Sequence, residues 1–185
     1  MRDEKILELF FARSQDALEQ VRRRYGSQMD HLAGNLLGNP LDAEECVNDA
    51  LLAAWNAIPP QQPKPLLPWL YATVRNLALK RVRQKRAEKR GGGEFALAYD
   101  ELAETLAARE DPQELLGARE LGEVVDRFLD TLSRQDRVLF LGRYWYGEPY
   151  SAMAARLGMT ENACAVRVSR TREKLRTYLK KEGVL

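Results

Sequence analysis

A group of cationic side chains in the last third of the chain has types and spacing suited to contact with a polyanion. The group consists of Arg167, Arg170, Arg172 and Lys174. These residues fall within a run of helical periodicity, Thr160–Lys174, which follows a shorter helical run, Tyr150–Gly158, and a turn. This order is typical of a helix-turn-helix, whose second helix enters the major groove of DNA and contacts phosphates and base edges.

The second helix of this pair is predicted to be amphipathic. Its apolar positions recur at intervals of four, three and four residues, namely Cys164, Val168, Thr171 and Leu175, which places them on one buried face. Arg167, Arg170 and Lys174 then share another face and can reach DNA. Thr160 is a good N-cap, and Gly158 suits the sharp turn. The alternative is an ordinary solvated amphipathic helix.

A second basic helix is predicted upstream, at Trp69–Arg90. Its part from Arg75 to Arg90 carries eight Lys or Arg residues against one acid, Glu88. Such a density favours phosphate neutralisation, although a solvated basic tail is the alternative. Trp69 and Tyr71 at its start could stack on an unpaired base. Both could equally be core residues, and for Trp69 we favour the core.

Acidic residues gather in two other places. Between Glu94 and Asp126 there are ten acids against Arg109 and Arg119, which is a strong local segregation of charge. The helix predicted at Asp42–Trp55 has an outward polar face made of Glu44, Glu45, Asn48, Asp49 and Asn56. That face is either solvated or a docking surface for a basic partner, and composition does not decide between the two.

Helical periodicity dominates the whole chain and predicts an all-α fold without strands. In the first half, one apolar stripe runs from Ile6 to Tyr25 and ends at Gly26, and a second runs from Met29 to Leu37. A third helix opens at Asp42 as N-cap, with Glu45 three residues on. Five prolines between Pro59 and Pro68 predict a stiff extended loop before the fourth helix.

In the second half, a helix is predicted from about Gln113, and Ser133 with Asp136 is predicted to cap the next one. The inward residues of that next helix are predicted to be Val138, Leu139, Leu141, Tyr144 and Trp145. We therefore predict two small helical domains, 1–90 and 113–185. A flexible acidic linker, 91–112, begins at the glycines Gly91–Gly93 and joins them.

Several classes of protein are disfavoured by the residues. With one histidine, no phosphate loop and no nucleophile-base pair, an enzyme is not expected. No metal or other cofactor is expected either, since His31 has no partners at metal-ligand spacing. Cys46 and Cys164 are far apart and are predicted to be core thiols in a reducing compartment. Without an apolar signal or spanning segment, we expect a cytoplasmic protein with no membrane insertion.

Three segments resemble a bacterial sigma factor of the extracytoplasmic-function type, which is group IV of the sigma-70 family. Asp42–Trp55 and Pro68–Arg86 resemble the family's domain 2, and Leu129–Leu175 resembles its domain 4. The resemblance covers nearly the whole chain, in the order of the family and with a short acidic tether between the two parts.

The resemblance implies a function in transcription initiation. Such proteins bind core RNA polymerase, through the clamp helices of its largest subunit and through its flap, and direct it to promoter DNA. Domain 4 reads the minus-35 duplex, for which we predict contacts from Thr160, Arg167, Arg170 and Lys174. Domain 2 reads the melted minus-ten strand, with predicted contacts from Arg75, Asn76, Lys80, Arg83 and Arg86. Glu45 and Asp49 match the polymerase-binding face. An anti-sigma partner is common in the family, although no residue here identifies one.

Some positions depart from the family pattern. Ala165 and Val166 stand where the family often has Lys and Ser, so Val166 is expected to touch a thymine methyl group. Ala53 replaces a frequent basic residue of the polymerase-binding part. Ala72 and Thr73 stand where housekeeping sigma factors carry two aromatic residues that hold the duplex open. We therefore predict weak intrinsic melting and stringent promoter choice.

Two other classes of function compete with this interpretation. One is a stand-alone dimeric helix-turn-helix repressor or activator, which would need a dimerising surface and a palindromic operator. The other is an adaptor that binds only proteins, which would leave Arg167 and Arg170 without a role.

Overall fold

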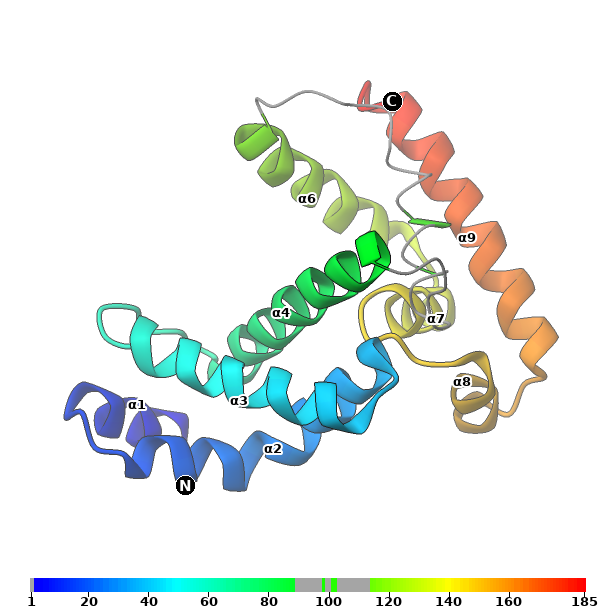
Figure 1. Ribbon diagram of the computed structural model, residues 1–185. Coiled ribbons are helices and arrows are strands. Elements are labelled where there is room, and N and C mark those ends of the chain that lie inside the picture. The colour runs from blue at the N-terminus through cyan, green and yellow to red at the C-terminus, as the bar shows by residue number, and fades with distance from the viewer. Residues whose placement is uncertain (1, 89–97, 99–100, 103–113) are drawn as a thin grey trace. The chain divides into compact units, whose positions relative to one another are not determined.

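The computed structural model describes residues 2–88, 98, 101–102 and 114–185, and the regular secondary structure of these residues is helical (Figure 1). The chain divides into two compact units, Met1–Gly93 and Glu94–Leu185. This confirms the predicted all-α fold class with two helical domains. The predicted linker 91–112 lies mostly outside the described residues, so its flexibility and the predicted domain limits stay predictions. Within the described residues, no helix is long and apolar enough to cross a membrane.

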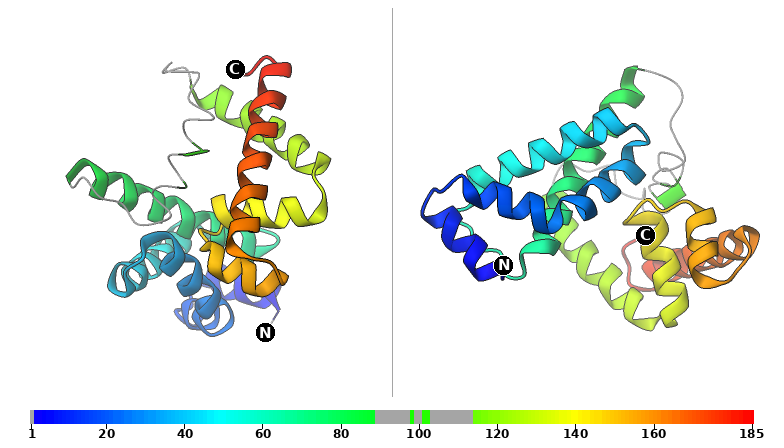
Figure 2. Two further views of the ribbon diagram at one scale, coloured as in Figure 1. Left: turned by 90° about the vertical axis from the view of Figure 1, so that its right-hand side faces the viewer. Right: turned by 90° about the horizontal axis from the view of Figure 1, so that it is seen from below.

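The first unit is built on three long helices that pack around one core. The helix α2 runs alongside α3, and α4 packs against both (Figures 1 and 2). The core side of α4 repeats every four residues, with Leu66, Leu70, Val74, Ala78 and Val82 all buried. The helices of this unit are α1 (Asp3–Phe11), α2 (Asp16–Leu37), α3 (Pro40–Ala57) and α4 (Leu66–Glu88).

The first predicted helix boundary, at Gly26, is wrong. The helix α2 continues through Gly26, and the break between α1 and α2 lies instead around Arg13, whose φ is 54°. A helical glycine costs about 1 kcal/mol, but α2 keeps one buried stripe on both sides of Gly26, through Tyr25 and Met29. The guanidinium of Arg13 donates to the carbonyl oxygen of Trp55 at 2.7 Å, which satisfies the end of α3 and holds the break in place.

The predicted start of α3 at Asp42 is also wrong. The N-cap is Asn39, whose side-chain oxygen accepts from the backbone N–H groups of Leu41 and Asp42 at 2.9 and 3.2 Å. Pro40 then occupies the first position of the helix, where its missing N–H is not needed. Glu45 is therefore not part of a capping box, and its carboxylate is available for another partner.

The proline-rich segment is shorter than predicted. The loop ends at Pro65, and α4 begins at Leu66, so that Pro68 lies in the first turn, which tolerates proline. The N-terminus of α4 is tied to α1, because the carboxylate of Asp3 accepts the backbone N–H of Leu66 at 3.2 Å. Tyr25 donates its hydroxyl to the other oxygen of Asp3. Thus α1 and α2 together hold the beginning of the basic helix.

The second unit has an aromatic core under a long C-terminal helix. Phe128, Phe140 and Tyr144 are buried, and the rings of Phe128 and Tyr178 lie 5.6 Å apart. The prediction that Trp145 faces inward is wrong, since it follows the last residue of its helix and is 41% exposed. The helices are α6 (Glu114–Thr131), α7 (Arg134–Tyr144), α8 (Tyr150–Leu157) and α9 (Glu161–Lys181).

The helix-turn-helix consists of α8 and α9. Gly158 between them has φ 64°, a left-handed conformation that favours glycine. Gly142 of α7 allows α8 to approach, because a Cβ atom there would lie 2.7 Å from the sulfur of the buried Met153. Ser133 caps α7 as predicted, accepting from the backbone N–H of Asp136 at 3.2 Å. These local features fix the start of α7, the packing of α8 against α7 and the turn between α8 and α9.

Candidate nucleic-acid interface

The helix α9 has the predicted cap and the predicted buried face. The hydroxyl oxygen of Thr160 accepts from the backbone N–H of Ala163 at 3.1 Å. The residues predicted to be inward are at most 2% exposed, namely Cys164, Val168, Thr171 and Leu175. The N-terminal half of α9 is the part that a helix-turn-helix places in the major groove. Its solvent-facing residues are therefore the candidates for base contact.

The structure separates the three predicted cations of α9 into two groups. Arg170 and Lys174 are exposed, and they line an open groove of about 780 Å³ between α9 and the junction of α6 and α7. Arg167 is instead only partly exposed, and its guanidinium forms an ion pair with Asp136 of α7 at 2.8 Å. Arg170 and Lys174 are therefore accessible from solvent, whereas Arg167 ties α9 to α7.

Asp136 joins the cap of α7 to α9. Its carboxylate accepts from the hydroxyl of Ser133 at 2.8 Å and from Arg167. Burial acts to raise the pKa of Asp136, but the hydrogen bonds from Ser133 and Arg167 outweigh it and lower the pKa below its usual value. The ionised carboxylate is thus the form that the folded unit stabilises.

We expect Asp136→Asn to destabilise the second unit by about 1–2 kcal/mol at neutral pH, because a charge-assisted hydrogen bond is lost. Since the pKa of Asp136 is lowered in the folded state, its contribution is present above the unfolded pKa and disappears as the pH falls through the folded one. Urea unfolding followed by circular dichroism at neutral and acidic pH measures this. A difference between variant and wild type that persisted unchanged in strong acid would contradict it.

On α4, the predicted minus-ten residues do not all face solvent. Asn76 and Lys80 are exposed, whereas Arg75 is 9% exposed and belongs to the interior of the unit. Arg83 and Arg86 lie in α4, but their side chains are outside the described residues. Asn76 and Lys80 are four residues apart and therefore share one face of the helix.

The aromatic residue at the start of α4 is not a core residue. Trp69 is partly exposed, and its indole N–H donates to the side-chain oxygen of Gln61 in the proline-rich loop at 3.1 Å. The hydroxyl of Thr73, one turn further, donates to the carbonyl oxygen of Trp69 at 2.9 Å. The preference for a core Trp69 is thus wrong, and the residue holds the loop against the helix.

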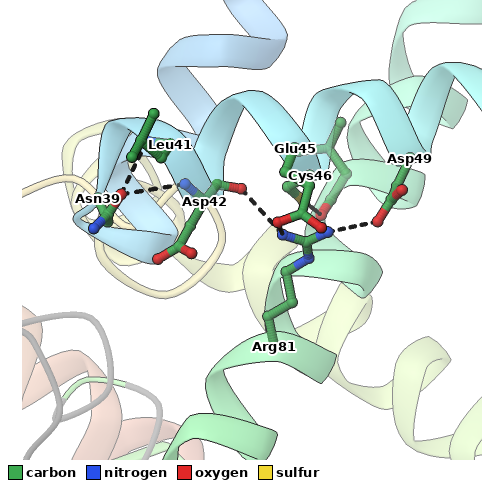
Figure 3. A network of polar contacts seen from close by, with 8 residues as sticks. Asn39, Leu41, Asp42, Glu45, Cys46, Asp49 and Arg81 are labelled. Carbon is green, nitrogen blue, oxygen red and sulfur yellow. Dashed lines mark hydrogen bonds and ion pairs between the residues drawn. The ribbon is translucent and has the colours of Figure 1, made fainter.

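The acidic face of α3 is paired with an arginine of α4. Arg81 of α4 reaches the carboxylates of Glu45 and Asp49 at 3.0 and 2.5 Å, and it also donates to the carbonyl oxygen of Asp42 at 3.3 Å (Figure 3). In the sequence analysis, Arg81 counts among the cations of the basic helix that face the minus-ten strand, and this pairing with α3 is not predicted. Its spacing held a signal, however, because Arg81 follows the buried Ala78 by three residues and so lies toward the same side of the helix.

Apolar side chains stand beside these acids on α3. Leu41 is 77% exposed and Leu52 is 57% exposed. Leu41, Glu45 and Leu52 are separated by four and seven residues, which places them along one side of the helix. Exposed leucines next to carboxylates are more typical of a protein-docking surface than of a purely solvated face.

One part of the predicted linker region is described and contacts the second unit. The carboxylate of Glu101 accepts from Arg172 of α9 at 2.8 Å and from the hydroxyl of Tyr144 at 3.2 Å. Nearby in sequence, Ala98 is fully buried. Burial raises the pKa of Tyr144 to about 12, although Arg172 acts in the opposite direction. Arg172 is therefore engaged within its own unit.

Two segments of the chain match known families. Residues 21–88 match Sigma-70 region 2, and residues 122–175 match Sigma-70 region 4. The first segment includes most of α2 and all of α3 and α4, and the second includes α7, α8 and most of α6 and α9. The matches thus fall on the two compact units, in the order that the sequence resemblance predicts.

Curated relatives carry related names. Over 165 residues the chain is 25% identical to the ECF RNA polymerase sigma factor SigE of Mycolicibacterium smegmatis, covering 89% of this chain and 62% of that protein. Over 140 residues it is 30% identical to the probable RNA polymerase sigma factor RfaY of Xanthomonas campestris, covering 74% of this chain and 34% of that protein. The chain therefore spans less than two thirds of the length of either relative.

A solved structure of CnrH in complex with the cytosolic domain of CnrY is also similar. The similarity covers 97% of each chain, with 21% sequence identity and a TM-score of 0.43.

The folded units define an all-helical protein of the helix-turn-helix class, with a second helical unit that carries a basic helix. The two family matches identify it further. The chain belongs to the sigma-70 family, as the sequence resemblance predicts.

Proposed function

We propose that this chain binds core RNA polymerase and directs it to specific promoters. The main support is the presence of sigma-70 regions 2 and 4, in that order, on two compact units of one chain. In this proposal the chain itself neither makes nor breaks a covalent bond. It acts in the cytoplasm, where polymerase and promoter DNA are found.

The two units take different roles in this proposal. The first unit, assigned to residues 1–90, binds polymerase through Glu45 and Asp49 and binds the minus-ten strand through Asn76 and Lys80. The second unit, assigned to 113–185, binds the minus-35 duplex through the N-terminal half of α9. Arg170 supports this role because it is exposed on that half, and the exposed Lys174 follows it by four residues on the same helix. Arg75 and Arg167 serve to hold the helices in place, since one is buried and the other is ion-paired.

The test is transcription with purified components. The full-length chain and purified bacterial core polymerase are incubated with a DNA library that has randomised upstream sequence, and the transcripts are sequenced. We expect transcripts that start at a fixed distance from two enriched elements with fixed spacing. The dimeric repressor or activator predicts instead that the chain alone selects a palindromic site and that no transcripts appear. The family matches do not favour that alternative.

We also expect strict dependence on the minus-ten element. Ala72 and Thr73 of α4 provide no aromatic wedge, so melting must rely on contacts with the element itself. Single-base changes in the selected minus-ten element are expected to lower open-complex formation at least tenfold, which corresponds to about 1.4 kcal/mol. Permanganate footprinting of unpaired thymines measures open-complex formation. Similar opening of matched and degraded elements would refute this prediction.

A further inference from the structure

Arg81 differs from its basic neighbours on α4 in the direction of its side chain. Lys80 is exposed, whereas the Arg81 side chain is only 17% exposed and reaches toward α3 (Figure 3). One of its terminal nitrogens lies 3.0 Å from an oxygen of Glu45, and the other lies 2.5 Å from an oxygen of Asp49. A single guanidinium thus bridges two carboxylates that are four residues apart.

The surroundings of Arg81 restrict it to this position. The carbonyl oxygen of Asp42 accepts a further hydrogen bond at 3.3 Å, so that three acceptors of α3 surround one guanidinium. Ala78 and Val82, on either side of Arg81 along α4, are buried in the core. Cys46, between the two acids in sequence, is fully buried and donates its thiol to the carbonyl oxygen of Val74 at 3.6 Å. Both helices are therefore fixed where the bridge forms.

Both carboxylates remain partly exposed to solvent. Glu45 is 69% exposed and Asp49 is 47% exposed, although both contact Arg81. A carboxylate has about four acceptor positions, so each can accept from Arg81 and from a partner at once. Two carboxylates four residues apart on a helix repel each other, and a cation between them removes that repulsion.

We propose that Arg81 is a positioning residue of the polymerase-docking face, which holds Glu45 and Asp49 ready for a basic partner and does not itself contact promoter DNA. This inference rests on the proposed function. Two physical effects carry it. The bridge fixes the rotamers of two flexible side chains before docking, which reduces the entropy lost on binding. It also supplies a compensating charge when docking excludes water from the two acids.

The matched experiment compares neighbouring cations of α4. Affinity for purified core polymerase, and affinity of the assembled holoenzyme for promoter DNA, are measured for Arg81→Met and Lys80→Met. Arg81→Met is expected to lower core affinity about tenfold, the loss expected when two side chains are no longer fixed, and to leave the promoter affinity of saturated holoenzyme unchanged. Lys80→Met is expected to leave core affinity unchanged and to lower the promoter affinity of the holoenzyme. Arg22→Met, which removes another ion-paired arginine of the same unit, is the control with unchanged core affinity.

A double-mutant cycle separates positioning from general stability. Asp49→Asn is expected to weaken core binding several-fold less in the Arg81→Met background than in the wild type, because the two residues act through one contact. Arg81→Lys keeps the charge but not the two-pronged geometry, and it is expected to recover part of the affinity. Additive effects of Arg81→Met and Asp49→Asn would overturn the inference, as would equal losses in Arg81→Met and Arg22→Met.

Failure of this inference is distinguishable from failure of the proposed function. If the wild-type chain does not bind core polymerase at all, the proposed function fails and the inference fails with it. If the wild type binds, and Arg81→Met binds equally well or loses promoter affinity instead, only the role of Arg81 is overturned.

Discussion

Reversing the charge of one carboxylate, Asp49→Arg, is expected to weaken binding of core RNA polymerase about 100-fold. Loss of one partner from an interfacial charge pair typically costs about 2–5 kcal/mol, and 100-fold corresponds to about 2.7 kcal/mol. The reversal also places a second guanidinium where Arg81 now meets a carboxylate at 2.5 Å. Titration of labelled chain with purified core, followed by fluorescence anisotropy, measures the affinity directly.

The chain offers a closely matched control in Asp30→Arg. Asp30 of α2 is 44% exposed and Asp49 is 47% exposed, and each forms an ion pair with an arginine. The two variants therefore change net charge equally and break a similar contact, but they lie on different helices. An equal loss of core affinity in both would show a general charge effect and contradict a specific docking role for α3. Circular dichroism of each variant checks that the helices remain intact.

The fold is predictable from sequence wherever its cause is local. The caps Ser133 and Thr160 and the turn at Gly158 depend on a few adjacent residues, and all three form as expected. The predicted helix boundary at Gly26 was wrong because the local preference of glycine for a helix end was outweighed by tertiary packing. The buried stripe of α2 continues past the glycine. The true helix break lies at Arg13, whose side chain is held by Trp55, 42 residues away in sequence.

The candidate site was predictable in composition but not in orientation. Helical spacing identified the cations of α9, and Arg170 and Lys174 are exposed as expected. The same spacing did not reveal that Arg167 pairs with Asp136, because that partner lies 31 residues away on another helix. Arg81 was grouped with the DNA-facing cations for the same reason, since the two carboxylates that it meets on α3 are 32 and 36 residues distant. A basic run on a helix therefore does not show which of its members are available to DNA.

Truncation of one exposed cation, Arg170→Ala, is expected to weaken holoenzyme binding to the selected minus-35 duplex about 10- to 100-fold. A good side-chain contact with a base contributes about 1–3 kcal/mol of discrimination, which sets this range. Arg170 is exposed on the half of α9 that a helix-turn-helix inserts into the groove. Binding to the selected promoter and to one with a scrambled minus-35 element is compared, and the larger loss is expected on the selected promoter.

Arg176→Ala is the matched control, because Arg176 has the same charge, is exposed on the same helix and lies nearer its C-terminus. Its effect is expected to stay within about threefold, as for a distant phosphate contact. Arg167→Ala is expected instead to lower the stability of the unit, since it removes the partner of Asp136.

Equal losses on the selected and scrambled promoters in Arg170→Ala would assign Arg170 to phosphate contact. Base recognition would then rest on other residues of α9, beginning with the exposed Val166.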